Sequence, residues 1–345
     1  MTQPIIGVHF EKSKKNKKVK KIILALLFIV IAFFLFFSFR LGIAFNKISI
    51  TNDPYSSEIA DQLFGINLLP IEKDYDMPKE EKDRLDILVL GVRDITGYNG
   101  TDGELLADSI VVVSFDKSTG KKSMISIPRD LYIKFGPNKK EKINAVYVLG
   151  LATGDALGFS KSIISRITGV YIDKVLVVDM NALKSVTDMV GGIDIHLSKP
   201  FEEASQWTYP FKLPAGDNHL NGEQALYYVR SRFSSSDFDR IRRQQEVIFA
   251  LEDKLLSLGF LANPIKINEL VGIVEKNIRT DIGLSDISSF FGLVKDIAKA
   301  SQEIKKYALT TENLLYETKE NEHYVLLPQG DNFDKIKEFF RDIIK

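Results

Sequence analysis

Hydrophobic and polar residues divide the chain into one long apolar run and a following region of shorter runs. Residues 22–39 are apolar except for Ser38, and this length suffices to cross the hydrocarbon core of a bilayer as a helix. Residues 12–21 are densely cationic, which by the positive-inside rule keeps the N-terminus in the cytoplasm. A cleaved signal peptide is the alternative, but the run is longer than a usual signal core and lacks a clear cleavage site. We therefore predict a transmembrane helix over 22–45, after a cytoplasmic basic arm over 1–21.

The rest of the chain would then lie outside the cell, behind a single membrane span. Residues 46–84 are mixed and polar and are interpreted as a juxtamembrane stalk. Residues 85–260 carry the main run of short apolar segments and are interpreted as the main folded domain. Residues 261–345 form a helical and strand extension that completes or flanks this domain.

Short, continuous apolar runs are typical of strands that are covered on both faces. Such strands are expected at 86–92, 109–115, 123–127, 174–179 and 193–197. Helices are expected at 160–168 and 182–189, and a last strand and helix between 324 and 344. The turn at 116–120 makes a hairpin of the second and third strands, and the aromatic segment 207–214 is expected to form an ordered loop. The order predicts an α/β fold with a mixed sheet sandwiched between helices.

Charge and composition narrow the function classes. The arm over residues 1–21 holds seven Lys and one Glu, so the rest of this neutral chain is acidic, which argues against nucleic acid as a partner. The absence of Cys excludes disulfides, thiolate metal sites and a Cys nucleophile. The four His are scattered without metal-ligand spacing, which speaks against a zinc site or a Ser-His-Asp triad.

Arginines are concentrated in one short segment. Five of the twelve lie between Arg230 and Arg243, which in an acidic region indicates a specific anion site. Arg230 and Arg232 point the same way only on extended chain. The helix that opens at Asn221 must therefore end before Val229 if both guanidiniums share a target.

The helix that follows places polar groups on its apolar face. With Asp237 as N-cap, helical spacing puts Asp237, Arg240 and Gln244 on the side of the core stripe, and Arg242 and Arg243 away from it. The stripe is formed by Ile241, Ile248, Leu251 and Leu255. Inward polar groups at a helix N-terminus favour an anion. The alternative is a buried structural ion pair between Asp237 and Arg240.

A second group of charged residues lies at strand ends. In an antiparallel meander of the first three strands, one edge would hold Arg93, Asp94, Asp108, Arg129 and Asp130. Two carboxylates there could hold Mg²⁺ (or Mn²⁺) and Arg129 a phosphate, although single Asp residues at strand ends are more often turn residues. Lys142 and Asn144 could add a phosphate contact and a hydrogen bond, or could cap a helix.

Eight segments resemble, in the same order, motifs of the LytR-CpsA-Psr family of cell-wall ligases. These segments are Asp86–Val92, Ala107–Ile110, Ser126–Leu131, Lys142–Ala145, Val190–Asp194, Leu220–Leu226, Tyr228–Arg232 and Asp237–Gln245. The resemblance implies a mixed sheet flanked by helices around an apolar pocket for a polyprenyl tail. It also implies transfer of a glycopolymer from undecaprenyl pyrophosphate to a peptidoglycan hydroxyl. A sensor or assembly factor without turnover, and a pyrophosphate hydrolase, are the alternatives.

The resemblance also assigns roles to residues. It implies pyrophosphate binding by Arg129, Lys142, Arg230, Arg232, Arg240 and Gln244. Asp108 matches a metal-site carboxylate, and Asp237 matches the acidic residue before the arginine helix. On this basis we expect Arg129, Asp108, Asp237 and Arg240 to be catalytic, with Asp237 or Asp94 accepting the proton of the acceptor hydroxyl.

Two departures from the family pattern affect the metal site. Leu106 stands where the family often has Arg. The loop at 97–103 is unusually rich in glycine, so the second metal carboxylate could be Asp94 or Asp102.

Overall fold

The computed structural model describes residues 77–93, 95, 105–136, 139–204, 206–232, 236–257, 264–282 and 304–344, all within the compact unit Phe45–Lys345. The predicted arm, membrane span and most of the stalk lie outside these residues. No helix among the described residues has the length and apolar character needed to cross a bilayer.

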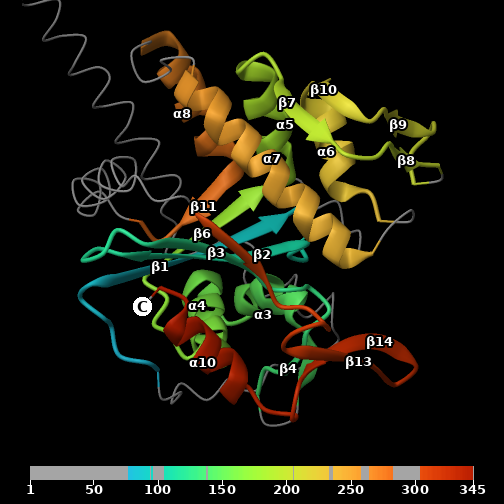
Figure 1. Cartoon of the computed structure of the whole chain (residues 1–345). Helices are drawn as coiled ribbons and strands as arrows, with labels where there is room; N and C mark the ends of the chain where they lie inside the picture. Colours follow the sequence, from blue (N-terminus) through green and yellow to red (C-terminus); the bar gives the residue numbers. More distant parts are fainter. Residues whose placement is uncertain are drawn as a thin grey trace, which may run out of the picture. The chain divides into compact units, whose positions relative to one another are not determined.

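A six-stranded mixed sheet forms the centre of the fold (Figure 1), in the order β11-β6-β1-β2-β3-β12. Its strands are β1 (Arg84–Val92), β2 (Ser109–Asp116), β3 (Lys122–Ser126), β6 (Lys174–Asp179), β11 (Ile278–Thr280) and β12 (Lys305–Ala308). The strands β1, β2 and β3 form the expected antiparallel meander, while β6 runs parallel to β1 and β12 runs parallel to β3. The predicted mixed α/β sheet is thus confirmed.

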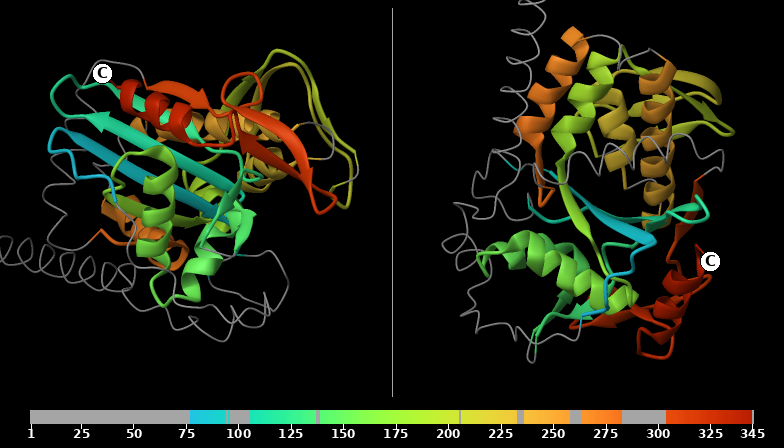
Figure 2. Two further views of the ribbon diagram at one scale, coloured as in Figure 1. Left: turned by 90° about the horizontal axis from the view of Figure 1, so that it is seen from below. Right: turned by 90° about the vertical axis from the view of Figure 1, so that its left-hand side faces the viewer.

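Helices cover both faces of the sheet (Figure 2). One layer contains η1 (Ile143–Ala145), α3 (Val146–Leu151), α4 (Ala156–Thr168) and α10 (Asp334–Asp342). The other contains α5 (Met180–Met189), α6 (Gly222–Arg230), α7 (Asp237–Ser257) and α8 (Pro264–Asn277). In β1, Leu88 and Leu90 are fully buried in the same core as Ile163 of α4. The alternate residues Val89 and Gly91 line a cavity on the α7 side, so only one face of the strand is tightly packed.

The described residues also form four two-stranded ribbons beside these layers. They are β4 (Tyr132–Lys134) with β5 (Lys140–Lys142), β7 (Ile193–Leu197) with β10 (Gly216–Leu220), β8 (Phe201–Glu203) with β9 (Phe211–Leu213), and β13 (Leu315–Glu320) with β14 (His323–Pro328). The expectation of a loop throughout 207–214 was wrong at its end, because Phe211 and Leu213 are buried and form β9.

The segment 304–344 adds a strand to the sheet and side chains to its core. Its strand β12 adds to the edge of the sheet beside β3, and the N–H of Leu309 donates to the carbonyl of Ser126 at 3.0 Å. The N–H of Leu326 donates to the carbonyl of Asp130 at 2.9 Å. Residues from both this segment and the sheet share one core. The segment therefore holds both ends of the Ser126–Asp130 connection, which carries Arg129.

Candidate functional site

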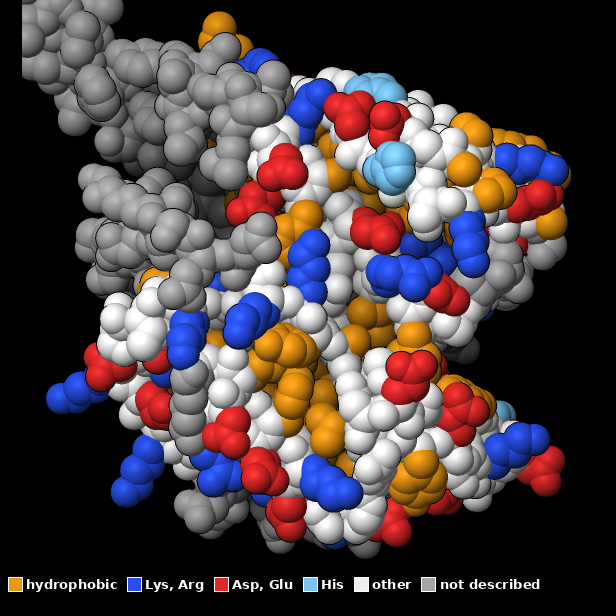
Figure 3. All heavy atoms as spheres, in the orientation of Figure 1, with side chains coloured by type: hydrophobic (Ala, Val, Ile, Leu, Met, Phe, Trp, Pro, Cys, Tyr) orange, Lys and Arg blue, Asp and Glu red, His pale blue; other side chains and the backbone are white. Residues whose placement is uncertain are grey.

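A cationic pocket of about 210 Å³ lies where the strand ends meet the start of α7. It is lined by Arg93, Asp108, Arg129, Met180, Gln206, Trp207, Val229, Arg230, Arg232, Arg240 and Gln244. Among these described residues, five guanidiniums face a single carboxylate, so the lining has a strong excess of positive charge. Basic side chains gather near the start of α7 in Figure 3. The pocket suits an anion with more than one charge.

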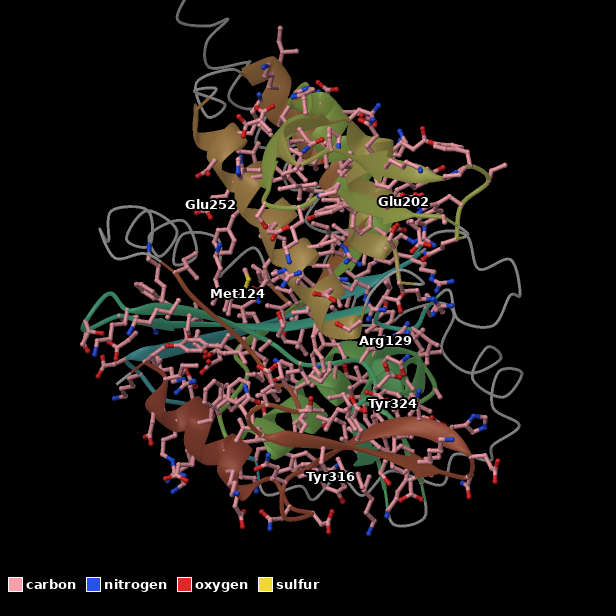
Figure 4. The ribbon with its side chains drawn as sticks, turned by 45° about the vertical axis from the view of Figure 1, so that its right-hand side comes forward. Met124, Arg129, Glu202, Glu252, Tyr316 and Tyr324 are labelled. Carbon is pink, nitrogen blue, oxygen red and sulfur yellow. The ribbon has the colours of Figure 1, made fainter. Side chains whose placement is uncertain are left out.

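An apolar cavity of about 380 Å³ adjoins this pocket. The two share the side chains of Met180, Val229 and Gln244 as a common wall. The cavity runs over the sheet below α7, and its lining includes Val89, Val111, Val113, Met124, Val178, Leu183, Val186, Val247, Ile248, Leu251 and Ile278. Figure 4 labels Met124, in the cavity wall, and Arg129, in the pocket. The arrangement therefore suits an amphiphile with an anionic head and an apolar tail.

The carboxylate of Asp108 organises the arginines on the sheet side of the pocket. Its Oδ1 accepts from a terminal nitrogen of Arg129 at 2.8 Å, and its Oδ2 accepts from Nε of Arg93 at 3.1 Å. Arg240 donates to the Asp108 carbonyl at 3.5 Å. Burial alone would raise the pKa of Asp108, but the charges of Arg129, Arg93 and Arg240 outweigh burial and hold this pKa below its ordinary value. Asp108 is therefore ionised at neutral pH.

Lys142 and Arg129 contact the same carboxylate, that of Asp130, and Lys142 is not among the residues that line the pocket. Its Nζ is 2.5 Å from Oδ1 of Asp130, a buried residue whose other oxygen is 3.5 Å from Nε of Arg129. The structure thus places the Lys142 ammonium on Asp130. Lys142 also occupies the N-cap position of η1, but its side chain makes no capping hydrogen bond there.

Asn144 links the strand ends through its backbone. Its carbonyl accepts from the N–H of Ala107 at 2.8 Å, and its N–H donates to the carbonyl of Arg129 at 3.3 Å. Asn144 itself is buried. These two bonds hold the residues before Asp108 and those around Arg129 side by side.

Arg230 and Arg232 share the pocket, but not in the way the spacing predicted. Helix α6 begins with a capping box between Asn221 and Gln224 and continues to Arg230, so the prediction that it ends before Val229 was wrong. Ser231 then turns to an extended conformation (φ −60°, ψ 131°). This change of backbone brings Arg232 to the same pocket as the last residue of the helix. Burial, with the charge of Arg93, lowers the pKa of Arg230, which indicates a site that an anion would stabilise.

Helix α7 is capped by Ser236 and not by Asp237. The hydroxyl of Ser236 accepts from the N–H of Asp239 at 3.1 Å, and the Asp239 carboxylate accepts from the N–H of Ser236 at 3.2 Å. This reciprocal pair is a capping box, and Asp237 is the first helical residue. The Asp237 side chain is not among those that the structure describes, so its expected role and its alternative pairing with Arg240 remain predictions.

The helical spacing placed Arg240 and Gln244 correctly and Arg243 wrongly. Arg240 and Gln244 are 3% and 8% exposed at the pocket, and no described group hydrogen-bonds to Nε2 of Gln244. Arg242 is exposed as expected, but Arg243 is only 3% exposed. Its Nε donates to the carbonyl of Tyr228 at 2.8 Å, and its guanidinium also donates to the carbonyl of Ser231. Helix α6 and the β8–β9 ribbon cover this second face of α7, which a single apolar stripe does not reveal.

Of the carboxylates predicted for the metal site, the structure describes Asp108. Asp94 and Asp102 lie outside the described residues, and the described residues contain no group of three metal-ligating side chains. Asp108 has the right chemistry for one ligand position, since it is an ionised carboxylate whose oxygens keep lone pairs beyond those that Arg93 and Arg129 use.

Five lining residues were not predicted as site residues: Arg93, Met180, Gln206, Trp207 and Val229. Arg93 was placed at the correct sheet edge, but without a role. Gln206 and Trp207 lie in the segment between β8 and β9. The aromatic composition of 207–214 was a signal for Trp207, whereas Gln206 had none. Trp207 stacks on Tyr227 with ring centroids 4.2 Å apart, and the Arg230 guanidinium lies 5.7 Å from the centroid of its ring.

Fold and site together define an α/β protein that presents arginines beside an apolar cavity. The model of the LytR_cpsA_psr family matches residues 56–341, and the chain belongs to this family. It is 30% identical over 272 residues to the polyisoprenyl-teichoic acid–peptidoglycan teichoic acid transferase TagV of Bacillus subtilis, a match covering 76% of this chain and 65% of TagV. The corresponding TagU of Enterococcus faecalis is 29% identical over 224 residues, 62% of this chain and 69% of that protein.

A solved structure supports the same relationship. The crystal structure of Bacillus subtilis TagV is 27% identical in sequence and has a TM-score of 0.57. The match covers 77% of this chain and 98% of the chain in that structure. The match to the TagV sequence spans less than two thirds of that protein.

Proposed function

We propose that this protein is a phosphotransferase that moves a glycopolymer from a polyprenyl (undecaprenyl) pyrophosphate carrier onto peptidoglycan or another cell-wall acceptor. The observation that carries this proposal is the wall of Met180, Val229 and Gln244 that the cationic pocket and the apolar cavity share. A lipid pyrophosphate has a matching combination of charged head and apolar tail. The names of TagV and TagU, which describe transfer of teichoic acid to peptidoglycan, support the proposal.

In this proposal the protein works at the outer face of the cell membrane. The apolar run at 22–39 would span the bilayer once, with the basic arm in the cytoplasm and the folded domain outside. Donor, acceptor and lipid bilayer would then meet on one side of the membrane, with no nucleic acid involved. A protein that lacks the span but keeps the domain would be expected to lose membrane association.

The arginines would carry most of the transfer chemistry. Arg129, Arg230, Arg232 and Arg240, with Gln244, would hold the two phosphates and neutralise the charge that develops on the leaving group. The acceptor hydroxyl would attack the phosphorus that bears the glycan, and the bond to the bridging oxygen would break to release polyprenyl phosphate. A carboxylate, Asp237 or Asp94, would take the proton of the hydroxyl.

A divalent cation, Mg²⁺ or Mn²⁺, is part of the same proposal. Asp108 would be one ligand, and Asp94 or Asp102 would be the other carboxylate. When bound, the cation would supply charge neutralisation at the phosphates. Chelator treatment followed by titration with Mg²⁺ tests this, with metal-restored transfer as the expected result.

The test of function uses the full-length chain, a short-tailed polyprenyl pyrophosphate sugar, Mg²⁺ and peptidoglycan. Transfer predicts that labelled sugar appears on peptidoglycan while polyprenyl phosphate is released. Labelled sugar phosphate in solution would instead identify a hydrolase, and tight binding without product would identify a sensor or assembly factor. Arg232→Ala should abolish transfer and leave the fold intact, since its side chain lies in the pocket and outside the core.

A further inference from the structure

The tripeptide Arg230–Ser231–Arg232 must present two neighbouring guanidiniums to one pocket. Arg230 is the last residue of α6, and Arg232 follows after a single extended residue. Two cations so close repel one another, and their long side chains favour spreading into solvent. The backbone of this tripeptide therefore needs a support that fixes its direction.

Gln206 supplies such a support with both ends of its side-chain amide. Its Nε2 donates to the carbonyl of Arg230 at 2.9 Å, and its Oε1 accepts from the N–H of Arg232 at 2.7 Å. This pair of bonds imitates the pairing of a β-strand with a neighbouring strand. It fixes the peptide groups on both sides of Ser231.

Trp207 holds the residue between the two arginines. Its Nε1–H donates to Oγ of Ser231 at 3.1 Å, and Oγ of Ser231, which is fully buried, donates in turn to the carbonyl of Tyr227 at 2.7 Å. Its ring also lies against Arg230. The dipeptide Gln206–Trp207 thus contacts every residue of the tripeptide.

We propose that Gln206 is a positioning residue, whose amide orders the backbone of Arg230 and Arg232 so that both guanidiniums bind one pyrophosphate. The inference rests on the proposed function and deepens it. Pre-ordering the two cations removes an entropic cost that would otherwise fall on ligand binding. Because Gln206 acts through the two arginines, its contribution to binding depends on their side chains.

A double-mutant cycle tests this dependence. Affinity for inorganic pyrophosphate is measured by titration calorimetry on the full-length chain, with thermal unfolding as a check of the fold. Gln206→Met, which keeps the side-chain volume and removes both hydrogen bonds, should weaken binding by about tenfold. In a background of Arg230→Ala with Arg232→Ala, where other pocket arginines still bind weakly, the same change should alter affinity by less than about twofold.

Glu202→Gln is the matched control. Glu202 lies on β8, the strand before Gln206 (Figure 4), and the change removes an exposed ion pair with Lys212. It should bind pyrophosphate as the wild type does. If Gln206→Met unfolds, Trp207→Phe replaces it, since this change keeps an aromatic ring and loses the indole N–H bond to Ser231. A loss of about threefold is expected there, again absent from the double-alanine background.

The outcomes separate this inference from the proposed function. Equal losses in both backgrounds would show that Gln206 contacts the ligand directly or acts only on the fold, and would overturn the inference while the proposed function stands. A wild-type affinity for Gln206→Met would overturn it in the same way. Failure of the wild type to bind pyrophosphate, or to release polyprenyl phosphate from the lipid donor, would count against the proposed function itself.

Discussion

Arg129 donates a hydrogen bond of 2.8 Å to the carboxylate of Asp108, the one described carboxylate that lines the pocket. The second oxygen of that carboxylate accepts from Arg93. Without Asp108, the neighbouring guanidiniums would face one another with little compensation in a partly buried site. The pair therefore lets the arginines stay close together before an anion arrives.

Replacement of Asp108 by Asn should separate binding from transfer. Asp108→Asn removes one negative charge from the pocket, so affinity for inorganic pyrophosphate should stay the same or increase. Transfer should fall by at least about 100-fold, because the proposed metal ligand is lost and Arg129 is no longer aligned by a carboxylate. Calorimetry and a transfer assay with the lipid donor measure the two quantities.

Asp116→Asn is the control for this change, because Asp116 is the last residue of β2, and among the described residues its carboxylate bonds only to Ser118 and Thr119 in the following turn. It should leave both quantities near wild type. Near-normal transfer by Asp108→Asn would remove Asp108 from the catalytic machinery.

Gly91 keeps the apolar cavity open next to the pocket. A Cβ at this position would lie 3.0 Å from Cβ of Ser109 and 3.2 Å from Cε of Met180, which belongs to the shared wall. Gly91→Leu should therefore fill this part of the cavity and weaken binding of a polyprenyl phosphate by at least about tenfold. Affinity for inorganic pyrophosphate, which has no tail, should change little.

Gly272→Ala is a suitable control, since a Cβ there meets no atom within 4 Å. It should leave both affinities unchanged. Equal losses for the lipid and for pyrophosphate in Gly91→Leu would show that the cavity does not take the tail.

The strands of the sheet could be predicted because their apolar runs are short and bounded by turn residues. The predicted run 86–92 lies within β1, and the turn at 116–120 does join β2 to β3. The predicted meander placed Asp108 and Arg129 at the same edge of the sheet, and in the structure the two side chains are in contact. The pairing of strands far apart along the chain, such as β12 with β3, could not be predicted, because no local sequence pattern identifies the partner strand.

The arginine helix shows where the sequence was insufficient. Spacing along α7 placed Arg240 and Gln244 inward because both lie on the side of its apolar stripe. Arg243 lies on another face, and its burial depends on β8 and α6, which pack there from elsewhere in the chain. The contacts of Gln206 with Arg230 and Arg232 were hidden for the same reason, since they join separate segments.

Arg243 should be important for stability, in contrast to its neighbour Arg242. Arg243→Met leaves two buried carbonyls without their donor and removes the contact with the Phe201 ring, whose centroid is 5.0 Å from the guanidinium. The free energy of unfolding should fall by about 2–4 kcal/mol. Urea denaturation followed by circular dichroism measures the loss.

Arg242→Ala is the comparison for this prediction. Arg242 is 68% exposed and pairs with Asp239 at 2.8 Å, an arrangement that contributes at most about 0.5 kcal/mol. Similar losses for the two variants would contradict the role given to Arg243.

Asp173 should make stability fall as pH rises through the weakly acidic range. Burial, with the nearby charge of Asp86, raises its pKa from 3.8 to about 6, against a hydrogen bond from the Asp86 N–H and the charge of Lys117. Between pH 3.8 and about pH 6, Asp173 holds its proton more often in the folded state than in the unfolded state. The free energy of unfolding therefore decreases as the pH rises through this range. Because Asp173 is partly exposed, the expected decrease is on the order of 1 kcal/mol.

Asp173→Asn isolates this contribution, since an amide oxygen can still accept the 2.8 Å bond from the N–H of Asp86 and cannot ionise. Relative to wild type, the variant should gain stability between pH 4.5 and pH 7.5 by about the same 1 kcal/mol. Asp217→Asn, whose side chain is 91% exposed on the β7–β10 ribbon, should follow the wild-type curve. Urea denaturation at several pH values gives all three curves. A constant difference between Asp173→Asn and wild type across this range would show that Asp173 does not titrate there, and that the Asp86–Asp173 contact contributes equally to stability at every pH.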